Sequence, residues 1–285
     1  MPWICENGHI ARTSALLADG ATRRGLANAI ASGRLIRVQK GTYSCAHLDS
    51  DALAAARAGT LIDCVSALAR HDKVWSGTES PTGLHLRARP HQQLGTVLAG
   101  ARIHWSAQYG APQHPLEASP VDAILQAMDC LAPIDALACL ESALHEGYLD
   151  EDGLNEVTRL APLRMAKTLR RMDRGAHSGF ETIVRVSIID AGYRVRTQVP
   201  VPGTSDVDVL VEDCVAIEVD GQKYHGPERF ISDRTKDLVI QRWGLRSMRI
   251  ARPHIFEDWP ETLATLDRLV AEARQGRPWR WNSTA

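Results

Sequence analysis

The chain lacks several features that would assign it to a class at once. Its six cysteines include no Cys-x-x-Cys pair, and no apolar run approaches the ~20 residues that span a bilayer. Residues 1–7 contain a glutamate and no apolar core, unlike a secretory signal. Lys and Arg number 33 against 34 Asp and Glu, so the formal net charge is only −1. We therefore expect a soluble cytoplasmic protein with free thiols, no membrane association, and only a local footprint for any nucleic acid.

The length of 285 residues is sufficient for two or three domains. Turn residues and changes in periodicity predict boundaries between residues 1–45, 46–175 and 176–275, followed by a tail over 276–285. Helical and strand-like patterns both occur, which indicates the mixed α/β (α+β) class.

Two runs with β-type alternation lie almost back to back, Asp206 to Glu212 and Cys214 to Asp220. Successive side chains of a strand point to opposite faces, so Asp208 lies opposite the valines around it, while Glu218 and Asp220 emerge together. Antiparallel pairing across the tight turn would bring Asp208 beside the other two. Carboxylates gathered in this way repel one another unless a cation lies between them. Hard oxygen ligands suit Mg²⁺ or Mn²⁺, so the pattern predicts a divalent-metal site.

The hairpin belongs to an ordered series of motifs. These are Ser178-Gly-Phe-Glu181, Val207-Asp208, Glu218-Val-Asp220-Gly221, His225, Asp233-Arg234-x-Lys236-Asp237 and Trp243-Gly-Leu-Arg-Ser-Met-Arg-Ile250. The series, which covers about residues 178–272, resembles the very-short-patch-repair-like endonuclease domains of the PD-(D/E)XK superfamily. The resemblance implies a restriction-endonuclease-like αβββαβ domain. It also shows one departure, because Asp220 stands where the wider superfamily usually has a lysine.

The resemblance further implies hydrolysis of phosphodiester bonds with Mg²⁺ or Mn²⁺. The catalytic set implied is Asp208, Glu218, Asp220, His225 and Glu181, of which Asp208, Glu218 and Asp220 are the metal ligands. Asp220 either adds a ligand or acts as a general base. His225, whose residue type has an ordinary pKa near neutrality, acts as an acid–base partner or positions the water. The residues expected to bind the scissile phosphate are Lys223, Arg234 and Lys236.

Residues 8–45 predict a small helix-turn-helix with a wing. Helices are expected over 11–18 and 22–32, with Thr22 as N-cap and Gly33 as the stop, and two short strands follow around Lys40-Gly41. The segment from Ala31 to Tyr43 resembles the winged-helix module of abortive-infection (AbiEi-type) antitoxins. This resemblance implies DNA as a partner and is compatible with a toxin partner. The side chains expected to contact DNA are Arg23, Arg24, Asn28, Arg34, Arg37 and Lys40.

The middle region predicts helices over 50–58, 61–70, 120–130, 133–146 and 151–160, with strands at 83–87 and 101–105. Five histidines lie here without the spacing of a helical metal motif, so we expect packing and surface roles for them. They are His71, His85, His91, His104 and His114. The set Cys5, His9, Cys45 and His47 also lacks a standard zinc spacing. Basic residues recur at helical spacing from Arg164 to Arg174, which predicts a solvated helix face, or secondarily a surface that follows phosphates.

Two functions from different classes remain open. The first is a metal-dependent DNA endonuclease or nickase: one site per chain implies nicking by a monomer or double-strand cleavage by a homodimer. The second is a DNA-binding repressor or antitoxin whose nuclease-like domain serves only as a scaffold, because a fold does not dictate a function.

Overall fold

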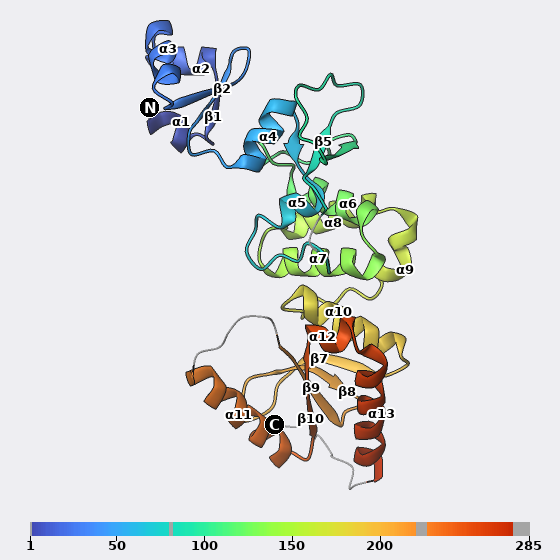
Figure 1. The fold of residues 1–285 in the computed structure, drawn as a ribbon. Helices are drawn as coiled ribbons and strands as arrows, with labels where there is room; N and C mark the ends of the chain where they lie inside the picture. Colours follow the sequence, from blue (N-terminus) through green and yellow to red (C-terminus); the bar gives the residue numbers. More distant parts are fainter. Residues whose placement is uncertain (1, 80–81, 221–226, 276–285) are drawn as a thin grey trace. The chain divides into compact units, whose positions relative to one another are not determined.

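The computed structural model describes residues 2–79, 82–220 and 227–275 (Figure 1). The chain divides into two compact units, each assembled from separate stretches of sequence. The first comprises Met1–Ala132 and Gly147–Met165, and the second Pro133–Glu146 and Ala166–Ala285. The predicted tail over 276–285 lies outside the described residues. The mixed α and β composition agrees with the predicted class.

The first unit begins with a three-stranded antiparallel sheet of order β1-β3-β2. The elements are α1 (Pro2–Glu6), β1 (Ile10–Arg12), α2 (Thr13–Ala18), α3 (Arg23–Ala31), β2 (Leu35–Gln39) and β3 (Thr42–Cys45). The two helices and the wing are confirmed, and the Thr22 side chain accepts the Gly25 N–H as predicted. The expected start of the first helix at residue 11 is wrong, because residues 10–12 pair with β3 instead.

The rest of this unit carries a second small sheet and several helices. They are α4 (Ser50–Ala58), β4 (Leu61–Ile62), α5 (Cys64–Leu68), β5 (His85–Ala88), β6 (Arg102–Trp105), α6 (Pro120–Cys130), α8 (Glu151–Leu160) and the 3₁₀ turn η1 (Leu163–Met165). The sheet order is β4-β5-β6, with β5 and β6 parallel. The helix predicted over 61–70 is wrong in its first residues, because Leu61 and Ile62 pair with β5 and Ile62 is fully buried.

The second unit is built on a four-stranded sheet of order β10-β9-β8-β7. Its elements are α7 (Pro133–His145), α9 (Ala166–Leu169), α10 (Gly179–Asp190), β7 (Val195–Val199), β8 (Val207–Val211), β9 (Val215–Asp220), α11 (Pro227–Arg242), β10 (Arg246–Ala251), α12 (Arg252–Phe256) and α13 (Trp259–Gln275). The strand β8 pairs antiparallel with both β7 and β9, whereas β9 and β10 are parallel. The helix α11 lies on one side of the sheet, and α10 and α13 lie on the other (Figure 1).

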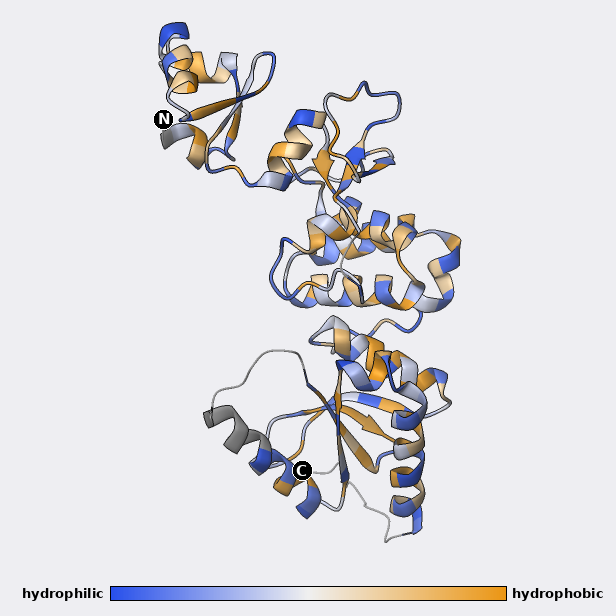
Figure 2. Ribbon diagram, in the orientation of Figure 1, coloured by the Kyte–Doolittle hydropathy of each residue, from blue (hydrophilic) through white to orange (hydrophobic). Residues whose placement is uncertain are grey.

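The alternation of β8 and β9 positions the functional side chains. Both strands are rich in hydrophobic residues (Figure 2), and Val209, Val211 and Ile217 are fully buried. Leu210 and Ala216 pack on the opposite face against Ile240 of α11. Asp208, Glu218 and Asp220 share that second face, and among them Glu218 is buried.

A buried ion pair joins α7 to α10. Glu141 accepts hydrogen bonds from Arg185 Nη2 at 2.7 and 2.9 Å and from the Asp173 N–H at 2.7 Å. The two charged side chains are 2% and 4% exposed. The predicted helix face over the basic residues 164–174 is wrong in its extent: only η1 and the four-residue α9 are helical there, and Arg171 pairs with Asp190.

Candidate metal centre

One polar residue from each strand of the four-stranded sheet lies in a row across it. Arg249 of β10 is paired with Glu218 of β9. The register of the two antiparallel ladders, continued by one residue, sets Asp208 of β8 beside Glu218 and Gln198 of β7 beside Asp208. The predicted approach of Asp208 to Glu218 is therefore what strand pairing produces.

The two central carboxylates are strongly perturbed by their surroundings. Asp208 Oδ2 accepts the Val219 N–H at 2.9 Å. Burial raises the pKa of Asp208, although the Val219 hydrogen bond opposes it. Glu218 is 7% exposed, and burial, followed by repulsion from Asp208, raises its pKa to about 7. Such shifts, caused by desolvation and a like charge, are typical of functional carboxylates.

Lys236 supplies the positive charge of this centre. Its Nζ lies 2.6 Å from Glu218 Oε2 and donates to the Asp206 carbonyl at 2.6 Å. The side chain is buried because it lies on the same stripe of α11 as Ile240, one turn further along. Lys236 was predicted as one of the residues that bind the scissile phosphate. The structure places it against Glu218, and the phosphate-binding role stays a prediction.

Asp220 does not join the two central carboxylates. Its Oδ1 lies 3.1 Å from Arg249 Nη1, and the same guanidinium reaches Asp237 Oδ1 at 3.2 Å. Among the described residues, no three carboxylates approach closely enough to share one ion. In the described part of the chain, the centre therefore consists of two neighbouring carboxylates, Asp208 and Glu218, and Lys236.

Glu181 forms a capping box with Ser178 at the N-terminus of α10. Its backbone N–H donates to Ser178 Oγ, and its Oε1 accepts from that hydroxyl at 2.9 Å. Its Oε2 accepts from the His177 N–H at 3.1 Å and from Gln198 Nε2 at 3.0 Å. Burial and then the Asp208 charge raise the pKa of Glu181. The predicted site residue thus reaches the centre through Gln198.

Gln198 was not singled out by sequence analysis. It has a φ of 45°, in the left-handed region that costs a residue other than glycine of order 1–3 kcal/mol. Its hydrogen bond lowers the pKa of Asp208, and it also holds Glu181. A glutamine in a strand offers no pattern from which this bridging position could have been inferred.

The remaining predicted residues divide into three groups. His225 and Lys223 lie outside the described residues, so their roles stay predictions. Arg234 is exposed on α11 and lies 3.3 Å from Asp237 Oδ2. The side chains predicted to contact DNA in the N-terminal module are all exposed: Arg23, Arg24, Asn28, Arg34, Arg37 and Lys40.

The central pair fits a small divalent cation. Glu218 Oε1 is buried without a hydrogen-bond partner in the described structure, while its other oxygen is held by Lys236. An orphaned buried carboxylate oxygen next to a second carboxylate is a hard-ligand set. Mg²⁺ commonly binds to one or two protein carboxylates and keeps several waters. Asp208 and Glu218 are the residues that would hold such an ion.

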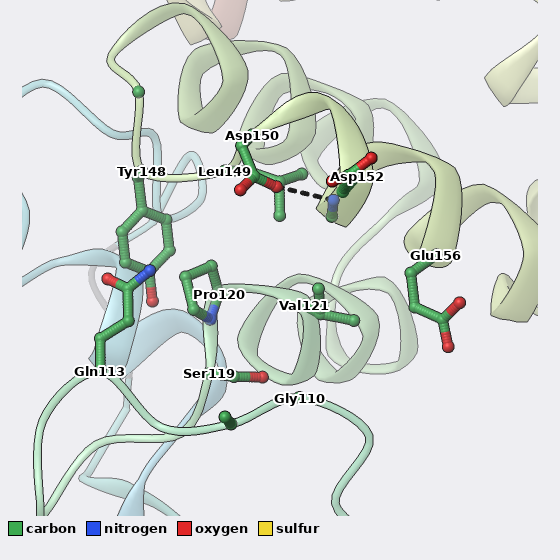
Figure 3. A pocket seen from close by; sticks show the side chains of 13 residues that line it. Gly110, Gln113, Ser119, Pro120, Val121, Tyr148, Leu149, Asp150, Asp152 and Glu156 are labelled. Atoms are coloured by element: carbon green, nitrogen blue, oxygen red, sulfur yellow. Dashed lines mark hydrogen bonds between the residues drawn. The ribbon is translucent and has the colours of Figure 1, made fainter.

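A hollow of about 300 Å³ in the first unit is a separate feature (Figure 3). Asp150, Asp152 and Glu156 line it, but Asp150 Oδ1 accepts the Gly153 N–H at 2.7 Å and so caps α8. Asp122, next to the lining Ser119, accepts from that hydroxyl and from two backbone N–H groups. These contacts give both aspartates structural tasks, and the hollow does not extend the metal centre.

Comparison with known proteins assigns no family to the chain. No protein-family model matches the chain, and no curated protein matches it either. No described helix is both long and apolar enough to cross a membrane.

Proposed function

We propose that the chain is a divalent-metal-dependent DNA endonuclease or nickase whose N-terminal winged helix contacts DNA. The observation that carries this proposal is the trio of Asp208, Glu218 and Lys236, of which Glu218 and Lys236 are buried and Glu218 Oε1 is unsatisfied. Two carboxylates and an ammonium group on one sheet face suit a reaction at an anionic phosphodiester.

Each member of the trio has a separate task. Asp208 and Glu218 would hold Mg²⁺ or Mn²⁺, which supplies charge stabilisation at phosphorus and activation of water. Lys236 offsets the carboxylate charge and fixes Glu218 through Oε2. Gln198 orients Asp208 from the neighbouring strand. Protonation of Glu218 competes with cation binding near neutral pH, because its pKa is about 7.

Asp220 and Arg249 border this centre. Asp220 does not join the two ligands, but it is the proposed general base, and Arg249 holds its carboxylate in place. If Asp220 has this role, Asp220→Asn should strongly reduce turnover while DNA affinity stays the same or rises. Full activity of Asp220→Asn would assign the proton transfer to another group, for which His225 is the candidate.

A repressor or antitoxin is the second candidate function. It is favoured by the N-terminal module, whose exposed basic side chains lie on α3 and at the turn between β2 and β3. It is also favoured by Lys236, since an internal ion pair satisfies part of the carboxylate charge without a metal. In this function the module binds an operator and the C-terminal unit acts as a scaffold.

One experiment separates the two candidates. Supercoiled plasmid is incubated with the purified chain and Mg²⁺ or Mn²⁺, and nicked and linear products are quantified. We expect cleavage by the wild type, none by Asp208→Asn or Lys236→Gln, and unchanged cleavage by the exposed control Asp213→Asn. Equal background with all four proteins, together with tight operator binding, would reject the endonuclease in favour of the repressor.

A further inference from the structure

Four side chains of types that can bind a metal converge in the first unit, whereas the centre described above belongs to the second unit. Cys64 is the first residue of α5, His85 lies on β5, His104 on β6, and Cys130 is the last residue of α6. One ligand atom from each lies within 4.8 Å of the other three. The four residues are far apart in the sequence, which is why their spacing did not suggest a metal site.

Strand pairing explains how the two histidines meet. In the parallel ladder, His85 is paired with Arg102 and His104 with Arg87. Paired residues point to the same face, and so do residues two apart on one strand. Both imidazoles therefore lie on one face, and His104 Nε2 is 3.0 Å from His85 Nδ1.

The distances are close to those of a tetrahedral zinc site. Zinc binds histidine nitrogen at about 2.0–2.1 Å and cysteine sulfur at about 2.3 Å, which gives edges of roughly 3.3 Å between nitrogens and 3.6 Å between nitrogen and sulfur. The observed nitrogen–nitrogen distance is 3.0 Å, and Cys130 Sγ lies 3.7 Å from His104 Nε2. Small movements of the side chains are enough to reach the ideal edges.

Three of the four side chains are buried, and one of the four residues has a strained backbone. Cys64, His85 and His104 are 0%, 5% and 8% exposed. Cys64 has a φ of 55°, a strained value for a residue other than glycine.

The neighbouring Arg87 ties the same elements to one another. Its Nε lies 3.0 Å from Asp63, and its Nη2 donates to the Asp122 carbonyl at 2.9 Å. Asp63 directly precedes α5, and Asp122 belongs to α6. The ion pair therefore positions the two helices that contribute the cysteines.

We propose that Cys64, His85, His104 and Cys130 bind one structural Zn²⁺ ion. Two thiolates and two imidazoles form the Cys₂His₂ set that zinc prefers, and four protein ligands leave no position for a substrate. The ion cross-links a sheet with strands of only two to four residues to α5 and α6.

Zinc content and the coordination shell test this proposal. The full chain is purified without a histidine tag, zinc per chain is measured, and the shell is determined by X-ray absorption. We expect one zinc with two sulfur and two nitrogen neighbours. The equivalent should be lost in the Cys64→Ser/Cys130→Ser double variant and kept in Cys214→Ser, whose cysteine is free and lies in the other unit.

A second variant excludes the other cysteine cluster. Cys5, Cys45 and His47 also lie within 4.8 Å of one another, so Cys5→Ser/Cys45→Ser must retain the zinc with the two-sulfur, two-nitrogen shell. If Cys64→Ser/Cys130→Ser does not fold, the shell in this second variant decides the question. The proposal is overturned by zinc that survives loss of Cys64 and Cys130, by a different shell, or by a Cys64–Cys130 disulfide without zinc.

Discussion

Asp208→Asn provides the sharpest test of the metal centre, because it should act in opposite directions with and without a cation. Asn keeps an oxygen that can accept the Val219 N–H but removes a charge next to Glu218. Directly opposite residues in antiparallel strands have Cβ atoms about 5 Å apart. Two like charges at that distance cost about 3 kcal/mol at an effective dielectric constant of about 20.

The net effect is smaller because Lys236 lies against Glu218 and because Glu218 is partly protonated near its pKa of about 7. We therefore expect Asp208→Asn to stabilise the protein in EDTA at pH 8 by about 1–2 kcal/mol. A change of 1 kcal/mol moves the melting temperature by about 2–4 °C in a unit of this size. In Mg²⁺ or Mn²⁺ at 100 times the dissociation constant, the wild type should gain about 2.7 kcal/mol.

The assay is thermal or urea unfolding of both proteins in EDTA and across a cation titration. The order of stability should reverse, with the variant above the wild type in EDTA and below it at saturating cation. The control Asp213→Asn changes an exposed turn carboxylate 3.1 Å from Arg196, and it should follow the wild type throughout. A variant that is less stable in EDTA, or one that keeps the cation response, would refute the reasoning.

Three further predictions concern other parts of the chain. Glu141→Ala should lower the free energy of unfolding by about 3–5 kcal/mol, because Arg185 stays buried without a partner charge or an acceptor. Burial raises the pKa of Glu141 above 4.5, so the native state binds that proton more tightly than the unfolded state does. The free energy of unfolding of the wild type should therefore decline as the pH rises from 4.5. Urea unfolding of Glu141→Gln should lack this part of the decline. Asp213→Gly should raise the free energy of unfolding by about 0.5–1 kcal/mol, since Asp213 has a φ of 54° in the turn between β8 and β9, and equal or lower stability in urea would contradict this. Arg23→Gln and Arg24→Gln should each reduce the salt slope of DNA binding by about one unit, and an unchanged slope in fluorescence titrations would remove the module as the DNA contact.

Local patterns were sufficient to predict the two central strands of the second unit. Alternation of valines with polar residues predicted β8 and β9, and the same alternation set Asp208 and Glu218 on one face. Short elements were not predicted, because a pattern needs several residues to be visible. A strand of three residues such as Ile10–Arg12 contains too few positions to show a period.

The position of Lys236 was not predictable from local pattern. Its burial depends on how α11 lies across the sheet, which Ile240 and its apolar partners on β8 and β9 determine. The Cys64 cluster depends in the same way on the pairing of β5 with β6 and on where α5 and α6 begin and end. Both groups are products of tertiary packing, whereas motif spacing reports only on neighbours along the chain.

The energetics of the trio Asp208, Glu218 and Lys236 favour the proposed metal site. Removing two carboxylates and an ammonium from water costs several kcal/mol for each ion, and well-packed apolar residues of similar volume are often neutral or stabilising in such positions. Glu218 keeps an oxygen without a partner in the described structure, and Asp208 raises its pKa further. Stability alone would favour neither feature. A site that must attract a cation needs both, because unsatisfied oxygens and mutual repulsion are relieved when the cation binds.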